Sequence, residues 1–501
     1  MEDFLKSIPH NFTSEEKKLL SKAFHVAEKA HAGQKRKSGE NYFTHPVEAA
    51  KILGQIFPDA LTLCATLLHD VPEDTAVTLE EIKNDFGEEL AKLVDGVTKL
   101  GHVRLLKGPD SAYLESLRKL FIATSEDVRV IIIKLADRLH NMRTIEFLPP
   151  EKQKKVAAET LEIYAPIAGR LGIGAWKDEL EDLAFQVVYT KEYEETKKLR
   201  DEEIKRRDEN VKEMQKNLRH IFHTEGVKYL EIKGRLKRLY SLYNKLKKYE
   251  GDITKIYDIM ALRIITKSTA DCYSVLGIIH AHFQPVPGRI KDFIATPKPN
   301  GYQSLHTTIF DKKGNVIEIQ IRTDLMHEEA ERGIAAHWFY SEEGKQDTTG
   351  RLSAPWIKEL RSWQDETGNP EEYLESLKID FFRDRIFVFT PQGDIKDLPM
   401  QASVIDFAFA VHSDLGYHMM GAKINGKMAK ITDTLKKGDV VEILKTKKEV
   451  TISRDWLDAA KTGNARNKIR HYLNEHDKGI IQRVKELKLQ DFKLPRFFRK
   501  K

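Results

Sequence analysis

The sequence has little cysteine and no long apolar run. Cys64 and Cys272 are its only cysteines, and each lies in an apolar segment far from the other. This scarcity argues against a disulfide framework and against a thiolate zinc site, and it predicts a reducing compartment. No stretch reaches the roughly 18 apolar residues that cross a bilayer, and the first residues lack the apolar core of a signal peptide. We therefore expect a cytoplasmic protein with no membrane partner and with both cysteines in its core.

The chain also lacks a strong net charge. It carries 83 basic and 77 acidic residues, which give a formal charge of +6. Any contact with nucleotides or nucleic acid must therefore come from local basic patches rather than from a global field. What the chain does have is length and apolar content, because 501 residues with 41% hydrophobic residues predict three or four globular domains.

Hydrophobic periodicity divides the chain into four segments. Residues 1–195 show helical spacing almost without strand signals, with a first cap at Thr13 or the residue after it. Residues 196–375 begin with a charged helical stretch and continue into alternating segments such as IYDIMALRIIT, which predicts a half-buried sheet. Residues 384–447 contain a strand, a PQGD turn and a strand, as in a small β-rich module. Residues 448–501 predict a basic helical tail.

Ionisable residues at predicted helix ends indicate a metal site. HDVPEDT begins with His69 and Asp70 directly after an apolar run, and His45 lies upstream in FTHP. Helical spacing in VRVIIIKLADRLHNMRT puts four polar residues on one face: Lys134, Asp137, Asn141 and Thr144. An inward carboxylate is costly unless it is paired or ligated, and imidazoles with carboxylates suit Mn²⁺ or a similar ion. For the His-Asp pair alone, a hydrogen-bonded helix terminus is the alternative.

Further charged residues lie next to this predicted site. Glu73 and Asp74 follow the His-Asp pair, and a carboxylate beside a metal-bound water can act as general base for attack on phosphorus. A Gly-containing loop before the predicted histidine ligand carries Arg36, Lys37 and Ser38, which would hold phosphate. A solvated loop is the alternative for these residues. Hydrolysis of a phosphate ester is the inferred reaction.

Three ordered motifs, HAGQKRKSGENYFTHP, HDVPEDT and KLADRLHNMRT, closely resemble the HD-type hydrolase domain of the RelA/SpoT homologue family, enzymes of the alarmone (p)ppGpp. The resemblance implies that Mn²⁺ is bound by His45, His69, Asp70 and Asp137, while Glu73 and Asp74 assist the water. It also implies that the nucleotide is surrounded by Arg36, Lys37, Ser38, Asn141 and Thr144. The implied reaction removes pyrophosphate from the 3′ position, and every residue that it requires is present.

A second predicted site lies in the alternating segments. In VIEIQIRT, Glu318, Gln320 and Arg322 alternate with isoleucines, so one strand face is polar. Asp258 begins a comparable strand with Arg263 further along. For either carboxylate alone, the solvent face of an amphipathic sheet is the alternative. The loop between the strands carries groups suited to triphosphate oxygens and to purine stacking: Arg289, Lys291, Lys298, Tyr302, Gln303 and His306.

Transfer of a phosphoryl-type group at this site needs a metal ligand and a base. Asp258 would hold Mg²⁺ and Glu318 would accept the proton. Upstream, GRLKRLYSLYNKLKKY predicts a basic helical stretch, for which a nucleic-acid-facing helix is the alternative. Its polar or small residues are Gly234, Arg235, Lys237, Ser241 and Lys245.

These motifs resemble the family's synthetase domain, whose fold is related to nucleotidyltransferases and which transfers pyrophosphate from ATP to the 3′-hydroxyl of GDP or GTP. The resemblance implies that Glu318 is the base, Asp258 binds Mg²⁺ and Tyr302 stacks on the acceptor guanine. ATP would be contacted by Arg235, Lys237, Ser241 and Lys245. The loop RIKD resembles the basic version in bifunctional members, and HEEAERGIAAHWFY resembles the helix that closes this domain, with a packing helix as its alternative.

The third module, which begins RIFVFTPQGDIKDLP, resembles a TGS domain of β-grasp fold. In this family the histidine of AVHSDLG, here His412, is implicated in contact with the tRNA 3′ end, and Lys423, Lys427 and Lys430 would contact the RNA backbone. A structural histidine in an intramolecular packing module is the alternative. DWLDAAKTGNARNKIRHYL resembles the start of the family's regulatory helical region, whose later Cys/His-bearing and ACT-type modules this sequence does not contain.

The sequence thus predicts a multidomain protein with four parts. They are an all-α HD-type hydrolase domain (1–195), an α/β nucleotidyltransferase-like synthetase domain (196–375), a TGS domain (384–447) and a short helical tail (448–501). The predicted function is a bifunctional GTP pyrophosphokinase and (p)ppGpp 3′-pyrophosphohydrolase of the stringent response. Its partners would be ATP, GDP or GTP and (p)ppGpp, with deacylated tRNA and the ribosome at the TGS domain. The alternatives are a catalytically silent tRNA or ribosome sensor and an HD-type nucleotidase, and the oligomeric state stays open.

Overall fold

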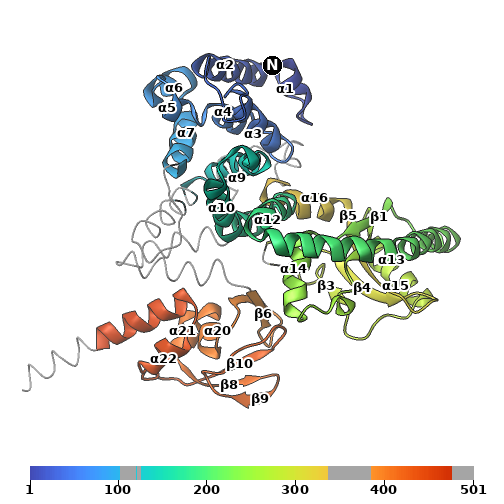
Figure 1. Cartoon of the computed structure of the whole chain (residues 1–501). Helices are drawn as coiled ribbons and strands as arrows, with labels where there is room; N and C mark the ends of the chain where they lie inside the picture. The colour runs from blue at the N-terminus through green and yellow to red at the C-terminus, as the bar shows by residue number, and fades with distance from the viewer. Residues whose placement is uncertain (102–119, 121–123, 125, 299, 337–384, 477–501) are drawn as a thin grey trace, which may run out of the picture. The chain divides into compact units, whose positions relative to one another are not determined.

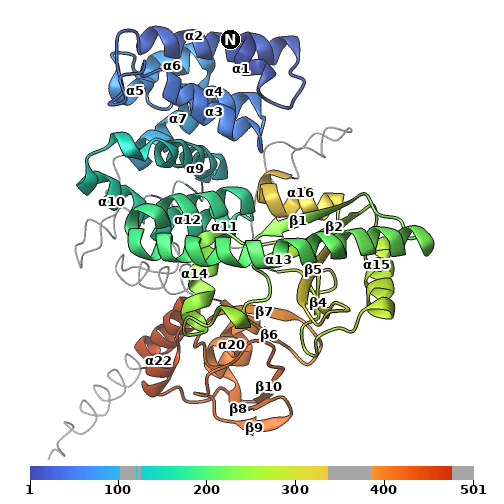
Figure 2. The same cartoon turned by 45° about the vertical axis from the view of Figure 1, so that its right-hand side comes forward.

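A computed structural model of the chain describes residues 1–101, 120, 124, 126–298, 300–336 and 385–476. The chain divides into two compact units, Met1–Arg361 and Ser362–Lys501 (Figures 1 and 2). The end of HEEAERGIAAHWFY and residues 477–501 of the predicted basic tail lie outside the described residues. No helix in the described ranges has the length and apolar character that crossing a membrane would require.

The first unit begins with a helical region made of α1 (Glu2–Lys6), α2 (Ser14–Ala30), α3 (Thr44–Gly54), α4 (Ala60–Leu68), α5 (Val71–Asp74), α6 (Leu79–Phe86), α7 (Glu88–Gly101) and α9 (Val128–Arg143). The cap at Thr13 is confirmed, because its side chain and Glu16 form a capping box at the start of α2. Helix α9 packs against α3, α4 and α7, as Figure 1 shows. This packing brings the C-terminal end of α4 and the N-terminal end of α3 to the middle of α9.

A second set of helices leads from this region to the sheet: the 3-10 helix η1 (Ile145–Phe147), α10 (Pro150–Glu159), the π-helical turn η2 (Thr160–Tyr164), α11 (Ala165–Arg170), α12 (Gly174–Val188) and α13 (Thr190–Thr224). Helix α12 packs against α9 and α10 on one side and against α13 on the other (Figure 2). Helix α13 continues through the predicted boundary between residues 195 and 196. The charged stretch is therefore one continuous helix that belongs to the packing of both regions.

The rest of the first unit is a mixed five-stranded sheet with its helices. Its elements are β1 (Glu231–Leu236), α14 (Leu239–Lys248), η3 (Ile253–Lys255), β2 (Met260–Thr266), α15 (Thr269–His282), β3 (Lys291–Asp292), β4 (Leu305–Phe310), β5 (Val316–Thr323), α16 (Asp324–Arg332) and η4 (Gly333–Ala335). The strand order is β1-β2-β5-β4-β3, with β2 and β5 parallel and the other pairs antiparallel. The predicted alternation is confirmed, because Ile317, Ile319 and Ile321 are buried in the core with α13 and α15. The prediction of a half-buried strand is wrong for β5, because Gln320 and Arg322 on its polar face are each only 2% exposed. Both cysteines are also buried, as predicted.

The prediction of one helical stretch in GRLKRLYSLYNKLKKY is partly wrong. Gly234 and Arg235 lie in β1, Lys237 lies between β1 and α14, and only the segment from Leu239 onward is helical. The physical reason is tertiary pairing, because β1 forms a complete antiparallel ladder with β2 that outweighs the helical propensity of its lysines, arginines and leucines. Asp258 likewise lies just before β2 rather than in it.

The second unit is a strand-rich module with helices on its core: β6 (Arg385–Phe389), β7 (Ile395–Pro399), α20 (Val404–Val411), α21 (Ser413–Tyr417), β8 (Met419–Ile424), β9 (Lys427–Ala429), β10 (Val441–Lys445) and α22 (Asp455–Ala459). The predicted hairpin is confirmed, since β6 and β7 pair antiparallel on either side of the PQGD turn. A three-stranded sheet of order β10-β8-β9 completes the module. Phe407 and Phe409 of α20 are buried in its core.

Asp406 is the polar centre of this unit. Its carboxylate is completely buried and accepts hydrogen bonds from the backbone N–H groups of Ser403, Lys461 and Thr462 and from the hydroxyls of Ser403 and Thr462. It therefore joins the start of α20 to the segment that follows α22. In an asparagine at position 406, the NH₂ group would face some of these hydrogen-bond donors and could not accept from them.

We predict that Asp406→Asn lowers the free energy of opening of the second unit by about 3 kcal/mol or more, because buried donors lose their charged acceptor. Asp433→Asn is the control, since Asp433 accepts one hydrogen bond from the Lys430 N–H at the surface, and its loss should cost about 1 kcal/mol. Hydrogen–deuterium exchange of the β6–β10 peptides in the full chain measures both effects. Equal protection in the two variants would contradict the prediction.

Candidate active sites

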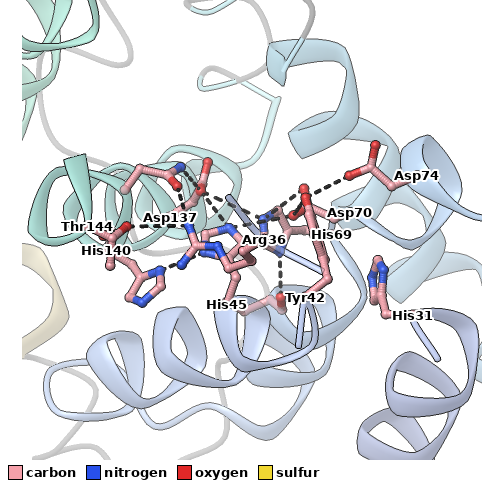
Figure 3. Close-up of polar contacts among 12 residues, drawn as sticks. His31, Arg36, Tyr42, His45, His69, Asp70, Asp74, Asp137, His140 and Thr144 are labelled. Carbon is pink, nitrogen blue, oxygen red and sulfur yellow. Dashed lines mark hydrogen bonds and ion pairs between the residues drawn. The ribbon is translucent and has the colours of Figure 1, made fainter. Parts of the chain in front are cut away.

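The structure brings the predicted metal ligands of the helical region together (Figure 3). His45 lies at the start of α3, His69 and Asp70 lie between α4 and α5, and Asp137 lies in α9. His45 Nε2 is 3.1 Å from Asp137 Oδ1 and 3.6 Å from Asp70 Oδ2, and His69 Nε2 is 3.1 Å from Asp70 Oδ1. Ligand atoms of His45, His69 and Asp137 all lie within 4.8 Å of one another. Helix packing therefore forms a compact donor set.

The hydrogen bonds of the two imidazoles leave one nitrogen of each ring directed into the cluster. His69 Nδ1 lies 2.7 Å from the Thr66 carbonyl oxygen, so Nδ1 donates and the buried Nε2 has no hydrogen-bond partner among the described residues. His45 Nδ1 lies 2.7 Å from His140 Nδ1. Burial lowers the pKa of His140 to about 3, so His140 is neutral and can accept from His45. Lone pairs facing carboxylates fit a divalent cation between them.

The carboxylates of this cluster are ionised despite their burial. Burial alone would favour neutral Asp137, but Lys134 and the two imidazoles hold its pKa well below the ordinary value. Lys134 Nζ is 2.7 Å from Asp137 Oδ2, and Asn141 Nδ2 donates to Asp137 Oδ1 at 2.6 Å. The pKa of Asp70 is also lowered, because positive charge at His69, His45 and Lys134 outweighs the effect of its burial, and a divalent cation between the ring nitrogens and the carboxylates would supply positive charge at the same place. The donors therefore have the charge that a divalent metal site needs.

The other predicted hydrolase residues divide into two groups. Arg36 Nη2 lies 3.4 Å from both Asn141 Oδ1 and Thr144 Oγ1, so these three side chains lie together next to the predicted metal ligand Asp137. In contrast, the Ser38 hydroxyl donates to Glu40 at 3.3 Å rather than toward the cluster. The remaining three are solvent-exposed: Lys37, Glu73 and Asp74.

Sequence reasoning missed Tyr42 and His140. The Tyr42 hydroxyl lies 2.7 Å from Asp74 Oδ2 and 3.0 Å from Asp70 Oδ2, so it bridges a predicted catalytic carboxylate and a predicted ligand (Figure 3). His140 orients His45 through the contact described above. The available signal was position, since Tyr42 lies three residues before His45 and His140 three residues after Asp137.

The second site is built around Asp258. Lys237 Nζ and Lys245 Nζ lie 2.8 and 2.6 Å from Asp258 Oδ2, respectively. Burial opposes ionisation, but these two ammonium groups lower the pKa of Asp258 far below its ordinary value. Its other oxygen, Oδ1, is buried without a hydrogen-bond partner among the described residues. The free carboxylate oxygen fits a cation such as Mg²⁺.

Glu318 lies on the polar face of β5 near Asp258. Gln320 Nε2 donates to Glu318 Oε1 at 3.0 Å, and His306 Nδ1 is 3.5 Å from the same oxygen. Burial would raise the pKa of Glu318, yet these neighbours lower it, so the carboxylate is ionised. Asp258 and Glu318 line one small cavity of about 30 Å³ together with Lys245, Arg289, Lys291 and His306.

A larger cavity of about 780 Å³ lies beside this one. It is lined by five of the predicted synthetase residues: Arg235, Lys237, Arg263, Lys298 and Tyr302. Three further predicted residues line neither cavity. Gln303 donates to the Ile294 carbonyl at 3.1 Å, Gln320 donates to Glu318, and Ser241 lies half-buried in α14.

Sequence reasoning did not assign a role to Arg322 or to the basic residues that α11, α12 and α13 contribute to the larger cavity. These are Arg170, Lys177 and Arg200. Arg322 offered a signal, because it shares the polar face of VIEIQIRT with Glu318 and Gln320. The helical residues offered none, since only the tertiary packing of α12 and α13 brings them to the sheet. Cations outnumber carboxylates around this cavity, which fits a polyanionic ligand.

We predict that Asp70→Asn lowers the affinity for a divalent ion by about 100-fold or more. Loss of a residue that only hydrogen-bonds to a metal ligand lowers metal affinity by about 10- to 100-fold, and loss of a ligand should cost at least as much. Mn²⁺ binding followed by electron paramagnetic resonance measures this without any catalytic readout. Asp85→Asn is the control, because Asp85 is a surface residue paired with Lys22. Unchanged Mn²⁺ binding in Asp70→Asn would remove Asp70 from the site.

Comparison with known proteins places these sites in matched regions. The HD domain family matches residues 23–174, the region found in RelA / SpoT proteins matches residues 234–345, and the TGS domain family matches residues 386–445. These matches confirm the predicted fold class: a helical domain, an α/β domain and a strand-rich module, in that order.

Curated relatives are similar over most of the chain. The GTP pyrophosphokinase of Streptomyces coelicolor is 44% identical over 92% of this chain and 56% of its own length. The guanosine-3′,5′-bis(diphosphate) 3′-pyrophosphohydrolase of Haemophilus influenzae is 42% identical over 93% and 68%. The bifunctional (p)ppGpp synthase/hydrolase SpoT of Escherichia coli is 42% identical over 91% and 65%. The chain spans 56% to 68% of the length of these relatives, and it belongs to the RelA/SpoT family.

Proposed function

We propose that the chain is a bifunctional alarmone enzyme of the stringent response. It transfers pyrophosphate from ATP to the 3′-hydroxyl of GDP or GTP, and it hydrolyses (p)ppGpp to GDP or GTP and pyrophosphate. The observation that carries this proposal is the presence of two separate carboxylate centres in one chain. One combines Asp70 and Asp137 with two imidazoles, and the other combines Asp258 and Glu318 with basic cavities. The names of these relatives include both activities.

In the proposed hydrolysis, the metal is Mn²⁺ on His45, His69, Asp70 and Asp137. When bound, this ion supplies Lewis-acid chemistry. A water oxygen attacks the phosphorus attached to the 3′-oxygen, the P–O3′ bond breaks, the 3′-oxygen of GDP or GTP is the leaving group, and the attacked diphosphate becomes pyrophosphate. Glu73 and Asp74 assist the water, and one of them accepts its proton, which then passes to the 3′-oxygen. The nucleotide is held by Arg36, Lys37, Ser38, Asn141 and Thr144.

In the proposed synthesis, Glu318 accepts the proton of the acceptor 3′-hydroxyl. The 3′-oxygen attacks the β-phosphorus of ATP, the bond from that phosphorus to the oxygen bridging to the α-phosphorus breaks, and AMP leaves. Asp258 holds Mg²⁺, and Tyr302 stacks on the guanine. The two nucleotides are contacted by the cavity residues Arg235, Lys237, Lys245, Arg263, Arg289, Lys291, Lys298 and His306. The proposal also assigns nucleotide binding to Ser241, Gln303 and Gln320, which line neither cavity.

The proposed partner of the second unit is RNA, as deacylated tRNA alone or on the ribosome. His412 is exposed, and its Nδ1 accepts a hydrogen bond from the Asp414 N–H at 3.2 Å, which caps α21. Lys427 and Lys430 are exposed, whereas Lys423 lies 3.2 Å from Glu442. The exposure of His412, Lys427 and Lys430 supports their proposed contact with RNA, whereas Lys423 is the weakest contact because Glu442 already pairs with it.

The two proposed chemistries separate in single variants. Glu318→Gln should lower synthesis by about 10² to 10⁴, because a positioned base is lost while shape is kept. Hydrolysis should survive in this variant, and the reverse pattern should hold for Asp70→Asn. Synthesis is measured with ATP, GDP and Mg²⁺, and hydrolysis with ppGpp and Mn²⁺. Equal loss of both activities in either folded variant would point to one shared site, and no activity in the parent chain would favour a silent sensor.

The RNA contact predicts a salt-dependent complex. Binding of labelled deacylated tRNA should weaken steeply between low and moderate salt, because phosphate contacts release counterions. His412→Ala should weaken binding at both salt concentrations, whereas His418→Ala should not, although His418 also lies beside Asp414. Indistinguishable binding by the two variants would remove His412 from recognition. Absence of binding by the parent chain would favour a packing role for this module.

A further inference from the structure

Two arginines on the polar face of the sheet share one carboxylate. Arg322 Nη2 lies 3.1 Å from Glu331 Oε1, and Arg263 Nη1 lies 3.4 Å from the same oxygen. Arg322 is only 2% exposed, and the Nε atoms of both arginines are buried without a hydrogen-bond partner among the described residues. Burial and the neighbouring guanidinium lower the pKa of Arg263 to about 10. The pair therefore keeps two positive charges in a region where one carboxylate compensates them.

This arginine pair belongs to the larger cavity. Arg263 and Arg322 both line it, and so does Glu331. Strand pairing sets their spacing, because Arg263 lies opposite Gln320, two residues before Arg322 on β5. Without the Glu331 carboxylate between them, the two guanidinium groups would repel each other and move apart, because both lie within 3.4 Å of one oxygen atom. Glu331, together with His327 Nδ1 at 2.5 Å from Arg322 Nη2, therefore sets how the two guanidinium groups face the cavity.

The helix that carries Glu331 is held by the helical region through direct backbone contact. The Ile334 N–H donates to the Leu171 carbonyl at 2.8 Å. A Cβ atom on Gly333 would lie 2.2 Å from the Leu171 oxygen, and one on Gly174 would lie 2.5 Å from the Ala330 oxygen. Gly333 also has a positive φ of 59°, which suits glycine. The end of α16 therefore packs closely against the loop between α11 and α12. The close contacts lie at Ala330 and Gly333, before and after Glu331 in the sequence.

We propose that Glu331 is a positioning residue of the ATP pocket, which holds Arg263 and Arg322 toward the donor nucleotide and is itself held by the loop at Leu171–Gly174. This inference rests on the proposed function, because it takes the part of the larger cavity lined by Arg235, Arg263 and Arg322 as the donor site, whereas Tyr302 lines the part that would face the acceptor guanine. A fixed arginine pair lowers the cost of ordering these side chains when the nucleotide binds. The helical region thereby contributes to ATP affinity without touching the reacting atoms.

The first test replaces Glu331 by Gln in the full chain. ATP binding in the presence of Mg²⁺ and absence of acceptor should weaken about tenfold in calorimetry, the loss expected for one charge-assisted hydrogen bond. The KM for ATP should rise by a similar factor, while kcat at saturating ATP and the hydrolysis of ppGpp stay at the parental values. Glu328→Gln is the matched control, because Glu328 lies on the same helix at 39% exposure, against 38% for Glu331, and pairs with Arg332. Equal or tighter ATP binding by Glu331→Gln would overturn the proposal.

The second test addresses the close packing of α16 against the loop between α11 and α12. Gly333→Ala forces α16 away from Leu171 and should weaken ATP binding in the same direction as Glu331→Gln. Since both changes act through the same arginine pair, their effects should not add. The double variant should bind ATP with about the same affinity as the single variant that binds ATP less tightly. Fully additive effects, or parental affinity in a folded Gly333→Ala protein, would overturn the role of the loop.

Failure of the proposed function gives a different result. If the parent chain binds no ATP with Mg²⁺, the donor assignment of the cavity is wrong, and the role of Glu331 falls with it. If the parent binds ATP and Glu331→Gln matches Glu328→Gln, the positioning role alone is wrong. Thermal unfolding of each variant establishes that the compared proteins are folded.

Discussion

An ionised carboxylate in a protein interior must be compensated by positive charge, and both candidate sites are organised by this requirement. Asp137 is compensated by Lys134 and lies against imidazoles whose free nitrogens face it. Asp258 is compensated on one oxygen by two lysines, and its other oxygen stays unpaired. In each case burial raises the cost of the charge, and the neighbours that offset this cost also leave a donor atom available for a cation.

The arginine pair of the larger cavity is subject to the same requirement, because buried positive charge also needs compensation by charge of the opposite sign. Arg263 and Arg322 are positive groups held mainly by Glu331, so the cavity keeps an unbalanced positive charge. A polyanionic nucleotide would balance it. The carboxylate centres and the basic cavity thus suit complementary parts of one phosphate-transfer reaction, in which a cation and arginines together neutralise the polyphosphate.

Much of this arrangement follows from local patterns. The end of the apolar run predicts that His69 and Asp70 follow the C-terminal end of a helix, and helical spacing places Asp137 and Asn141 on one face. Strand alternation likewise separates Glu318 from the buried isoleucines of β5. These features were predictable because each depends on residues close in the sequence.

Features that depend on tertiary contact were not predictable in this way. Arg235 lies in a strand because β2 offers a partner, although its own segment has helical propensity. Tyr42 and His140 act on ligands from other helices, and Glu331 reaches Arg322 only after α16 has folded back on the sheet. The residues that orient the ligands and the arginines are therefore set by hydrogen bonds between different helices and strands. The spacing of residue types along the sequence does not predict such contacts.

The central claim is that one chain both builds and removes a 3′-pyrophosphate. The most direct measurement uses ATP labelled at the β-phosphorus with GDP and Mg²⁺, followed by addition of Mn²⁺. The account predicts that the label moves first into ppGpp and then into free pyrophosphate, because both reactions occur at the same phosphorus. Label that stays in ATP, or that appears only as inorganic phosphate, would contradict it.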